Sequence, residues 1–334
     1  MKFDVIIGNP PYQLSDGGNS ASAMPIYHTF IQQAKKLNPR YLTMITPSRW
    51  FVGGRGLNAF RSEMLNDDRL RIIHDYPHAS DCFPGVEIKG GVSYFLWDRD
   101  HAGLCEIHTH VNDKEKVDTR PLLEDGLDVF IRTSNQLSIL NKTRDVTEEF
   151  LNNAIAPGRH FGFHTQIKWD GSKGTLQTAD GQSSFPITKS STDQNSVMVY
   201  IANGTCWISP KNIVRNKDDI NKWKVLIPRS GNPSGSILGK PKLSEPGTCS
   251  SNTYNVVICS SEQEARNLIA YLKTKFVRFL VSIRTVTQDM APKAFEFVPV
   301  QDFSKTWTDE ELFKKYSLDA DEILAIESSI PEMD

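Results

Sequence analysis

The sequence predicts an α/β domain at residues 1–150, a β-rich domain at 151–303 and a helical tail at 304–334. In the first segment, short apolar runs alternate with amphipathic helical stretches, an order typical of α/β folds. Between 165 and 260, β-type runs alternate with loops rich in Gly, Pro and Ser, which is typical of a β-rich domain. The tail returns to helical periodicity.

The chain begins with the stretch FDVIIGNPPYQ at residues 3–13. Val5, Ile6 and Ile7 are β-branched and apolar, which predicts a buried strand that ends at Gly8. The two prolines that follow fix φ, remove two backbone donors and push the residues before them towards extended geometry. We therefore expect a stiff loop at the carboxyl end of a parallel strand, where open α/β sheets bind their ligands.

The loop residues Asn9, Pro10, Pro11 and Tyr12 present an uncommon set of groups. The Asn9 side-chain oxygen and the Pro10 carbonyl are acceptors that suit a planar exocyclic amine. By taking both amine hydrogens they draw the nitrogen lone pair out of conjugation. The Tyr12 ring can stack on the attached heterocycle. We interpret the loop as an amine-binding site, with a plain Asn-Pro-Pro turn as the alternative.

The next elements follow from periodicity and from Pro and Gly positions. Residues 14–23 are rich in Gly, Ser and Asn, which predicts a lid beside the loop. The segment PSRWFVGGRG predicts a second loop at the same sheet edge. The predicted elements are a helix from Pro25 to Asn38, a strand at 41–46, a helix at 58–65, and strands at 69–75, 92–97 and 104–111.

The motif and its context resemble the N6-adenine DNA methyltransferases, which carry [DNS]PP[YFW] after an apolar strand. The segments ITPSRWF, LNAFRSEML, RIIHDY and GGVSYFLW follow the loop in the family's order and at similar spacing. The chain looks like the carboxyl part of a γ-class, type IIG restriction-modification methylase, over nearly all of its length. This implies the second half of a Rossmann-like methyltransferase domain, followed by a β-rich target recognition domain.

The resemblance also implies roles for individual residues. Asn9 and Pro10 would hold the target amino group, Tyr12 would stack on the extruded base, and Pro11 would form the wall beside the methyl donor, S-adenosylmethionine. In PGRHFGFHT, either Phe161 or Phe163 would supply a second aromatic ring, besides Tyr12, to stack on the flipped base. Ordinary core packing is the alternative for both phenylalanines.

Charge indicates where double-stranded DNA would bind. Residues 151–303 hold 18 Lys+Arg against 11 Asp+Glu, while 1–150 hold 17 against 20 and 304–334 hold 3 against 9. A formal net charge of −2 thus hides a basic middle segment, as expected if it faces phosphates. A moderately basic solvated surface would have the same composition.

The candidate DNA contacts are Arg229, Lys240 and Lys242, around the loop GNPSGSILGKPKLSEPG. Its glycines fit neither a P-loop nor GxGxxG, so nucleotide binding is not expected, and a plain surface loop is the alternative. A single long helix is predicted at 261–283, capped by Ser261. Its basic residues are either a solvated face or a phosphate stripe. In the tail, two amphipathic helices are predicted, the first with a Thr308–Glu311 capping box.

Cysteine and histidine spacing predicts no metal site. The five cysteines lack CxxC spacing and are typical of reduced thiols. His108 and His110 alternate on a predicted strand, where an exposed face is favoured over a ligand pair. The absence of a long apolar run and of a signal peptide favours a cytoplasmic protein that does not enter the membrane.

The donor site is the missing element. The resembling family binds S-adenosylmethionine upstream of the NPPY motif, where this chain has Met1 and Lys2. We therefore expect a partner half or subunit, and an apolar sheet edge at residues 3–7 in its absence. Three functions stay open. They are adenine-N6 DNA methylation together with that partner, DNA binding or specificity without catalysis, and methylation of another amine such as a protein glutamine or an RNA guanine.

Overall fold

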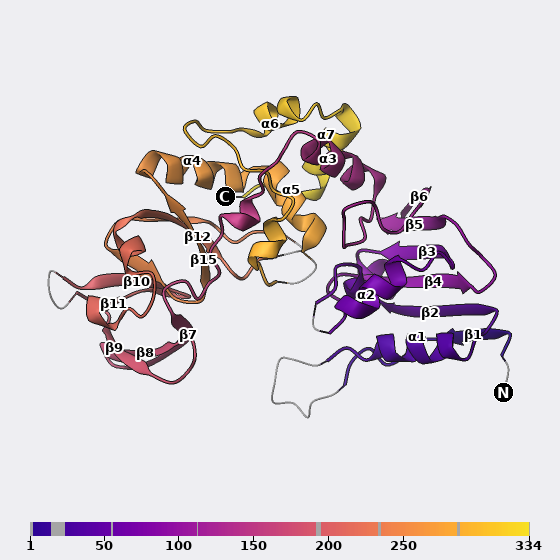
Figure 1. Cartoon of the computed structure of the whole chain (residues 1–334), viewed down its shortest axis with the longest axis horizontal. Helices are drawn as coiled ribbons and strands as arrows, with labels where there is room; N and C mark the ends of the chain where they lie inside the picture. Colours follow the sequence, from indigo (N-terminus) through magenta and orange to yellow (C-terminus); the bar gives the residue numbers. More distant parts are fainter. Residues whose placement is uncertain are drawn as a thin grey trace. The chain divides into compact units, whose positions relative to one another are not determined.

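The computed structural model describes most of the chain. The described stretches are residues 3–14, 24–54, 56–111, 113–191, 195–232, 235–285 and 288–333. They form two compact units, Met1–Leu137 and Ser138–Asp334 (Figure 1). Each unit has its own hydrophobic core.

The first unit is built on a mixed sheet. Its strands are β1 (Val5–Gly8), β2 (Tyr41–Pro47), β3 (Leu70–Tyr76), β4 (Val92–Asp98), β5 (Cys105–Val111) and β6 (Lys114–Arg120). Their order is β1-β2-β4-β3-β5-β6, with β1 parallel to β2, β3 parallel to β5, and β4 antiparallel to both of its neighbours. This confirms the predicted α/β fold, including the hairpin strand at 92–97.

Two helices pack into one core with this sheet. They are α1 (Tyr27–Lys36) and α2 (Asn58–Leu65), and α2 has the predicted bounds. Their buried side chains join alternate residues of the strands, including Met44, Ile73 and Phe95. The intervening strand residues, such as His74 and Tyr94, are only partly buried. Because successive side chains of a strand point to opposite faces, the second face of the sheet carries these rings.

Strand β1 lies at the edge of the sheet and is paired to β2 alone. Val5 is 49% exposed and Ile7 77% exposed, so the prediction of a buried strand is wrong. Its β-branched composition favours the extended conformation. Ile6 packs against the core on one face, but within the described residues nothing covers the other face, which carries Val5 and Ile7. The expected apolar edge at residues 3–7 is confirmed.

The second unit is rich in β structure, as predicted for residues 165–260. One sheet has the order β14-β10-β11-β9-β8-β7, and a smaller sheet has the order β13-β12-β15. The strands are β7 (Phe163–Asp170), β8 (Lys173–Thr178), β9 (Ser184–Thr188), β10 (Val197–Ile201), β11 (Gly204–Ile208), β12 (Trp223–Pro228), β13 (Lys242–Ser244), β14 (Thr248–Ser250) and β15 (Tyr254–Cys259).

The predicted helix at 261–283 is two helices, α4 (Glu262–Lys273) and α5 (Lys275–Arg284). The Asp309 carboxylate accepts from the backbone N–H groups of Lys275 at 2.9 Å and Phe276 at 2.8 Å. This partner, distant in sequence, makes residue 275 a new helix start. The predicted cap is confirmed, because the Ser261 side chain accepts from the Glu264 N–H.

The tail belongs to the second unit and does not form a separate domain. It carries α6 (Asp309–Lys315) with the predicted Thr308–Glu311 capping box, and α7 (Ala320–Ser329). Helix α3 (Ser134–Arg144) contacts α7, since Ser138 and Lys142 each bind Glu322 at 2.6 Å. The observed boundary after Leu137 therefore precedes the predicted boundary at residue 150.

Short 3₁₀ helices complete the described structure. They are η1 (Ser48–Phe51), η2 (Ala79–Asp81), η3 (Leu151–Asn153), η4 (Pro210–Asn212), η5 (Lys217–Asn221) and η6 (Pro292–Phe295). Among the described residues, every helix is too short or too polar to cross a membrane.

Candidate active site

The Asn-Pro-Pro-Tyr loop begins where β1 ends, as predicted. Asn9 and Pro11 are exposed, Pro10 is buried and Tyr12 is half-buried against the core of the first unit. The parallel neighbour β2 ends at the same edge of the sheet, at Pro47. The buried proline anchors the loop, and its exposed neighbours face outwards.

A short ladder fixes the far end of the loop. The Ile26 N–H donates to the Tyr12 carbonyl, and the Leu14 N–H donates to the Met24 carbonyl, each at 3.1 Å. Gln13 and Pro25 form an isolated bridge between them. The backbone that carries the Tyr12 ring is thus fixed by hydrogen bonds to residues 24–26. Apart from Leu14, the lid predicted at 14–23 lies outside the described residues.

All four loop residues line one cavity of about 750 Å³. This volume falls within the usual range of small-molecule sites. The residues that line it are Asn9, Pro10, Pro11, Tyr12, Gln13, Pro25, Tyr27, Pro47, Arg49, Phe83, Val86, Glu87, Ile88 and Lys89. The structure therefore brings the predicted amine-binding residues together around a space that can hold a heterocycle.

The wall formed by residues 83–89 was not predicted from the sequence. It lies between β3 and β4 and supplies Glu87 and Lys89 as charged groups. Arg49 comes from the loop after β2, which the sequence did place at this sheet edge. The sequence signal for Arg49 was its position directly after β2, a strand parallel to β1. Residues 83–89 carry no comparable sequence signal.

Buried polar contacts hold this wall in place. The Ser48 hydroxyl donates to Asp75 at 2.9 Å, and Arg132 lies 3.2 Å from the other oxygen of that carboxylate. Arg132 also donates to the Gly90 carbonyl. Burial raises the pKa of Asp75, while the Arg132 guanidinium and the Ser48 hydroxyl oppose the shift. Asp75 thus connects the strand ends behind the cavity to the start of β4.

Tyr12 enters the site as a neutral phenol. Burial raises its pKa above the usual value, and the Cys82 thiol adds to the shift. A neutral ring suits stacking on an uncharged base better than a phenolate would. Asn9 is exposed and lines the cavity, so its side-chain oxygen can be reached by a ligand.

The other predicted site residues lie in the second unit. Phe161 and Phe163 are fully buried in its core, so neither ring presents a face to a base, and core packing is the correct interpretation. Arg229 lines a cavity of about 370 Å³ together with Tyr254. Lys242 is exposed and donates to the Tyr254 hydroxyl at 3.1 Å.

The remaining basic residues divide into exposed and buried groups. Lys240 is exposed on the loop before β13. Arg229 is partly neutralised, because it donates to Asp289 at 3.0 Å and to Asn252 at 2.8 Å. On α5, Arg278 is buried and donates to the Lys273 and Pro331 carbonyls. It therefore belongs neither to a solvated face nor to a phosphate stripe.

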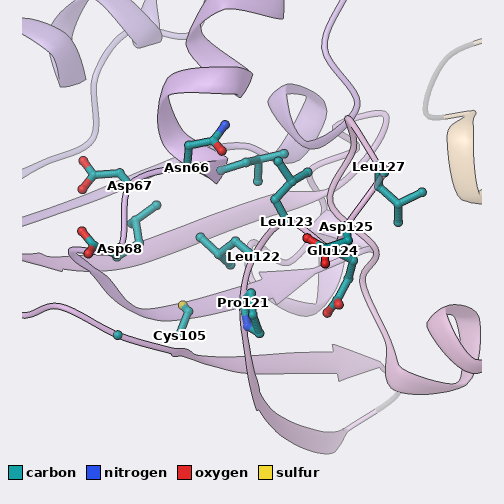
Figure 2. A pocket seen from close by; sticks show the side chains of 14 residues that line it. Asn66, Asp67, Asp68, Cys105, Pro121, Leu122, Leu123, Glu124, Asp125 and Leu127 are labelled. Carbon is teal, nitrogen blue, oxygen red and sulfur yellow. The ribbon is translucent and has the colours of Figure 1, made fainter.

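A second pocket of the first unit, about 270 Å³, lies apart from the Asn-Pro-Pro-Tyr loop (Figure 2). Its lining includes the carboxyl groups of Asp67, Asp68, Glu124 and Asp125. This concentration of negative charge disfavours phosphate-bearing ligands. It is not a candidate for the methylation chemistry.

His108 and His110 share one face of β5, as their alternation predicted, but they are not simply exposed. Their side chains are 15% and 22% exposed, and both stack with His74 of β3. Burial lowers the pKa of His74 to about 4, and His108 and His110 add to the shift. For His108, burial also acts to lower the pKa, but hydrogen bonds with Glu115 and Glu106 outweigh it and raise the pKa.

Two solved structures resemble the chain at low identity. The type IIG restriction endonuclease BpuSI is 12% identical, with 95% of this chain and 49% of that chain covered and a TM-score of 0.37. The type IIL restriction-modification enzyme MmeI, in complex with DNA, is 12% identical, with 79% and 42% covered and a TM-score of 0.41.

Two sequence comparisons also find similarity to methylases. A protein of Mycoplasma pneumoniae (strain ATCC 29342 / M129 / Subtype 1), described as an uncharacterized adenine-specific methylase, is 41% identical over 121 residues, which are 35% of this chain and 28% of that protein. The chain thus spans less than a third of this relative. The family model of the Eco57I restriction-modification methylase matches residues 1–83, a shorter stretch than the nearly complete resemblance expected. Over these residues the chain is similar to the Eco57I restriction-modification methylases, which confirms the family resemblance predicted from its Asn-Pro-Pro-Tyr motif.

Proposed function

We propose that the chain carries the target-base site and the DNA-recognition region of a site-specific adenine-N6 DNA methyltransferase of a restriction-modification system. The observation that carries the proposal is the cavity of about 750 Å³ lined by all four residues Asn9, Pro10, Pro11 and Tyr12. The similarity to a protein described as an adenine-specific methylase supports adenine as the target.

In this proposal the adenine is turned out of the duplex, at a cost of a few kcal/mol that pocket contacts offset. The Asn9 side-chain oxygen and the Pro10 carbonyl accept the two hydrogens of the N6 amine. These bonds draw the nitrogen lone pair out of conjugation with the ring and increase its nucleophilicity. The Tyr12 ring stacks on the base, and the proton leaves the nitrogen after the methyl group is attached.

The methyl donor implied by the family resemblance is S-adenosylmethionine, and the described residues do not assemble a site for it. The glycine-rich turn that contains Gly53 and Gly54 is already engaged, because the Gly54 N–H donates to the Asn58 side chain at 2.7 Å. Glu87 is the one carboxyl group in the described lining. Pro11 is proposed to lie only at the margin of the donor site.

We therefore propose that a further segment or subunit holds the donor and pairs with the open edge of β1. The position of β1 at the end of the sheet supports this, since an edge strand offers unpaired backbone groups for strand addition, and the 77% exposure of Ile7 leaves an apolar face beside it to be covered. Binding of DNA without catalysis is the second candidate, favoured for the isolated chain by the incomplete donor site. Methylation of a protein glutamine or an RNA guanine lacks such support.

For DNA binding we propose the second unit. Arg229 lines one cavity with Tyr254, Lys242 donates to the Tyr254 hydroxyl, and Lys240 is exposed nearby in sequence. Their positive charges would contact backbone phosphates, which gives affinity that falls as salt rises. Asp289 reduces the contribution of Arg229, so Lys240 and Lys242 are proposed as the stronger contacts.

The experiment is to express the native gene that encodes this chain, together with the gene for the donor-binding subunit where that is separate, in a host free of DNA methylation, and to read modified bases along the host genome. The proposal predicts N6-methyladenine at one sequence motif. Modified cytosine only, or an unmodified genome despite stable expression of the protein, would contradict it. The DNA-binding candidate predicts an unmodified genome together with salt-dependent DNA affinity of the purified protein.

A further inference from the structure

Three strands of the first unit bring histidines and carboxylates to one place on the sheet, and none of these residues lines the cavity at the Asn-Pro-Pro-Tyr loop. His74 of β3 lies opposite His108 of β5 in the parallel register, and His110 of β5 lies opposite Glu115 of β6. Because side chains alternate along a strand, these groups all point to the face opposite the α1 and α2 core. The cluster therefore joins β3, β5 and β6.

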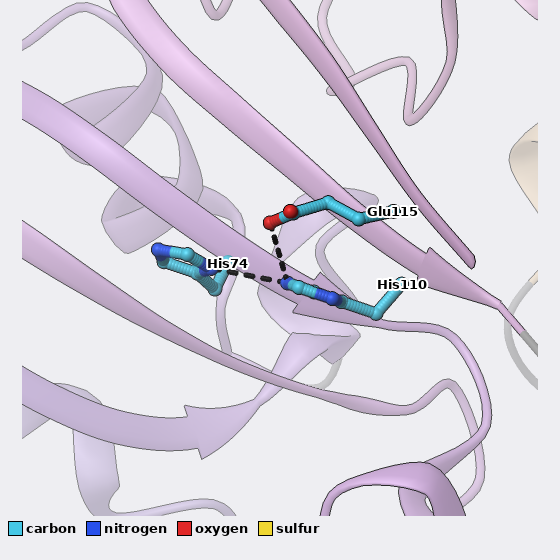
Figure 3. A group of neighbouring side chains, drawn as sticks. All are labelled: His74, His110 and Glu115. Atoms are coloured by element: carbon cyan, nitrogen blue, oxygen red, sulfur yellow. Dashed lines mark hydrogen bonds and ion pairs between the residues drawn. The ribbon is translucent and has the colours of Figure 1, made fainter. Parts of the chain in front are cut away.

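The donor atoms of three side chains converge (Figure 3). His74 Nδ1 lies 3.0 Å from His110 Nε2, and Glu115 Oε1 lies 3.6 Å from the same nitrogen. One ligand atom from each residue lies within 4.8 Å of the others. Zinc binds nitrogen and oxygen at about 2.0–2.2 Å, so its tetrahedral ligands are roughly 3.3 Å apart. The observed separations bracket this value.

Neighbouring groups hold the rings and the carboxylate in position. Tyr94 stacks on His74 at a centroid distance of 4.5 Å, and Tyr76 stacks on His110 at 4.3 Å. His108 Nδ1 lies 2.7 Å from Glu115 Oε1, while its Nε2 lies 2.6 Å from Glu106 Oε1. A carboxylate oriented by a second histidine is the kind of outer-shell contact that tunes metal ligands.

We propose that His74, His110 and Glu115 bind one divalent transition-metal ion of the zinc type, through two imidazole nitrogens and one carboxylate oxygen. Two nitrogens and one oxygen match the ligand preference of Zn²⁺, and of Co²⁺ in its place. His108 is a positioning residue that orients Glu115. The fourth ligand position is open to water or to an exogenous group.

The ion would connect two strands that are not neighbours in the sheet, since backbone hydrogen bonds link β3 to β6 only through β5. Strand β6 is the edge strand, its side chains are mostly exposed, and it pairs with β5 alone. A single ion held by His74 and Glu115 would join β6 directly to β3. The predicted consequence is a metal-dependent rise in melting temperature of the full chain, since a ligand that binds only the folded state stabilises it.

The competing account is an imidazole pair without metal, in which one ring nitrogen of His74 or His110 donates to the other. To separate the two, the full chain is prepared without a histidine tag, treated with EDTA and titrated with Zn²⁺ by calorimetry. We expect one equivalent to bind. Co²⁺ in place of Zn²⁺ should give the visible absorption bands of a tetrahedral site.

Variants assign the site. His74→Ala, His110→Ala and Glu115→Gln should each weaken Zn²⁺ binding at least ~10-fold, whereas the matched control His101→Gln, outside the cluster, should bind as the parent does. Glu115 is exposed on the edge strand, so Glu115→Gln keeps the test valid if a histidine variant fails to fold. Absence of stoichiometric binding by the folded parent, or undiminished binding by Glu115→Gln and the folded histidine variants, would overturn the proposal.

Discussion

The Ser48 hydroxyl donates a 2.9 Å hydrogen bond to the fully buried carboxylate of Asp75. Ser48 follows the last residue of β2, and Asp75 lies near the end of β3. The same carboxylate pairs with Arg132, which holds the Gly90 carbonyl. One buried carboxylate thereby connects the loop that carries Arg49 to the segment that forms the opposite wall of the cavity.

Asp75→Ala should destabilise the protein strongly, because it leaves the partly buried Arg132 without its counter-charge. Removing one partner of a buried ion pair costs about 3 kcal/mol or more. Ser48→Ala removes a single hydrogen bond and should cost about 1 kcal/mol. Urea unfolding monitored by circular dichroism measures both. The exposed Asp68→Ala is the control, and equal losses for Asp75→Ala and Asp68→Ala would contradict the assigned role.

Two glycines offer a matched pair, one within the wall segment at residues 83–89 and one just after it. Both have positive φ, at +81° for Gly91 and +79° for Gly85. A Cβ at Gly91 would lie 2.2 Å from the Tyr76 carbonyl oxygen, whereas a Cβ at Gly85 would meet nothing within 4 Å. Gly85→Ala should therefore lower the free energy of unfolding by about 1 kcal/mol, because alanine is less stable than glycine in the left-handed backbone conformation.

Gly91→Ala adds a backbone clash to that conformational cost, so its loss of unfolding free energy should clearly exceed the loss of Gly85→Ala. The comparison uses the same urea titration for both proteins. A Gly91→Ala protein as stable as Gly85→Ala would show that the backbone around Tyr76 yields easily, which the structure does not predict.

Asp67 makes stability depend on pH in the acid range. Burial acts to raise its pKa, but hydrogen bonds from Arg69, Lys35 and Trp97 outweigh it and lower the pKa to about 2. Because the folded-state pKa lies below the unfolded value of 3.8, the contribution is present above pH 3.8 and is lost as pH falls towards 2. It amounts to about 2 kcal/mol.

Asp67→Asn should therefore lower stability at neutral pH and flatten its decline between pH 4 and 2. Urea midpoints across that range, compared with those of Asp68→Asn, measure the effect. A decline as steep in Asp67→Asn as in the parent would mean that other carboxyl groups are responsible.

Tyr12 should act through its ring and not through its hydroxyl group. Tyr12→Phe keeps the stacking surface and should retain affinity for DNA that carries an unpaired adenine. Tyr12→Ala should lose about 1 to 3 kcal/mol of that affinity. Fluorescence anisotropy with folded variants provides the measurement, and an abasic duplex is the control. Equal loss in both variants would assign the effect to the hydroxyl group instead.

The sequence was most informative where local chemistry decides the structure. The β-branched run followed by two prolines sufficed to predict the strand and the loop, and a resemblance to methylases followed from them. The exposure of Ile7 was not predictable from composition, because a β-branched run forms a strand whether or not a second layer covers it. The apolar sheet edge at residues 3–7 was predicted only from the resemblance to the methylases.

Long-range contacts account for most of the remaining differences. At the break between α4 and α5, the Thr274 side chain caps α5 locally by accepting from the Val277 N–H, and Asp309, distant in sequence, adds a second cap. The burial of Phe161 and Phe163 depends on how the sheets of the second unit close around them, and aromatic residues beside glycine fit a core and a binding site equally well. The wall at residues 83–89 depends on Asp75 and Arg132, whose pairing no short motif records.

The most direct test of the central claim is methyl transfer by Asn9→Ala in the intact enzyme. Gly8→Ala is the matched control, because a Cβ at Gly8 would meet Met44 at an ordinary 3.6 Å. The account predicts that Asn9→Ala loses N6-methyladenine formation by at least ~100-fold, with DNA affinity unchanged, while Gly8→Ala methylates as the parent does. Normal methylation by a folded Asn9→Ala enzyme would contradict the claim that this side chain holds the target amine.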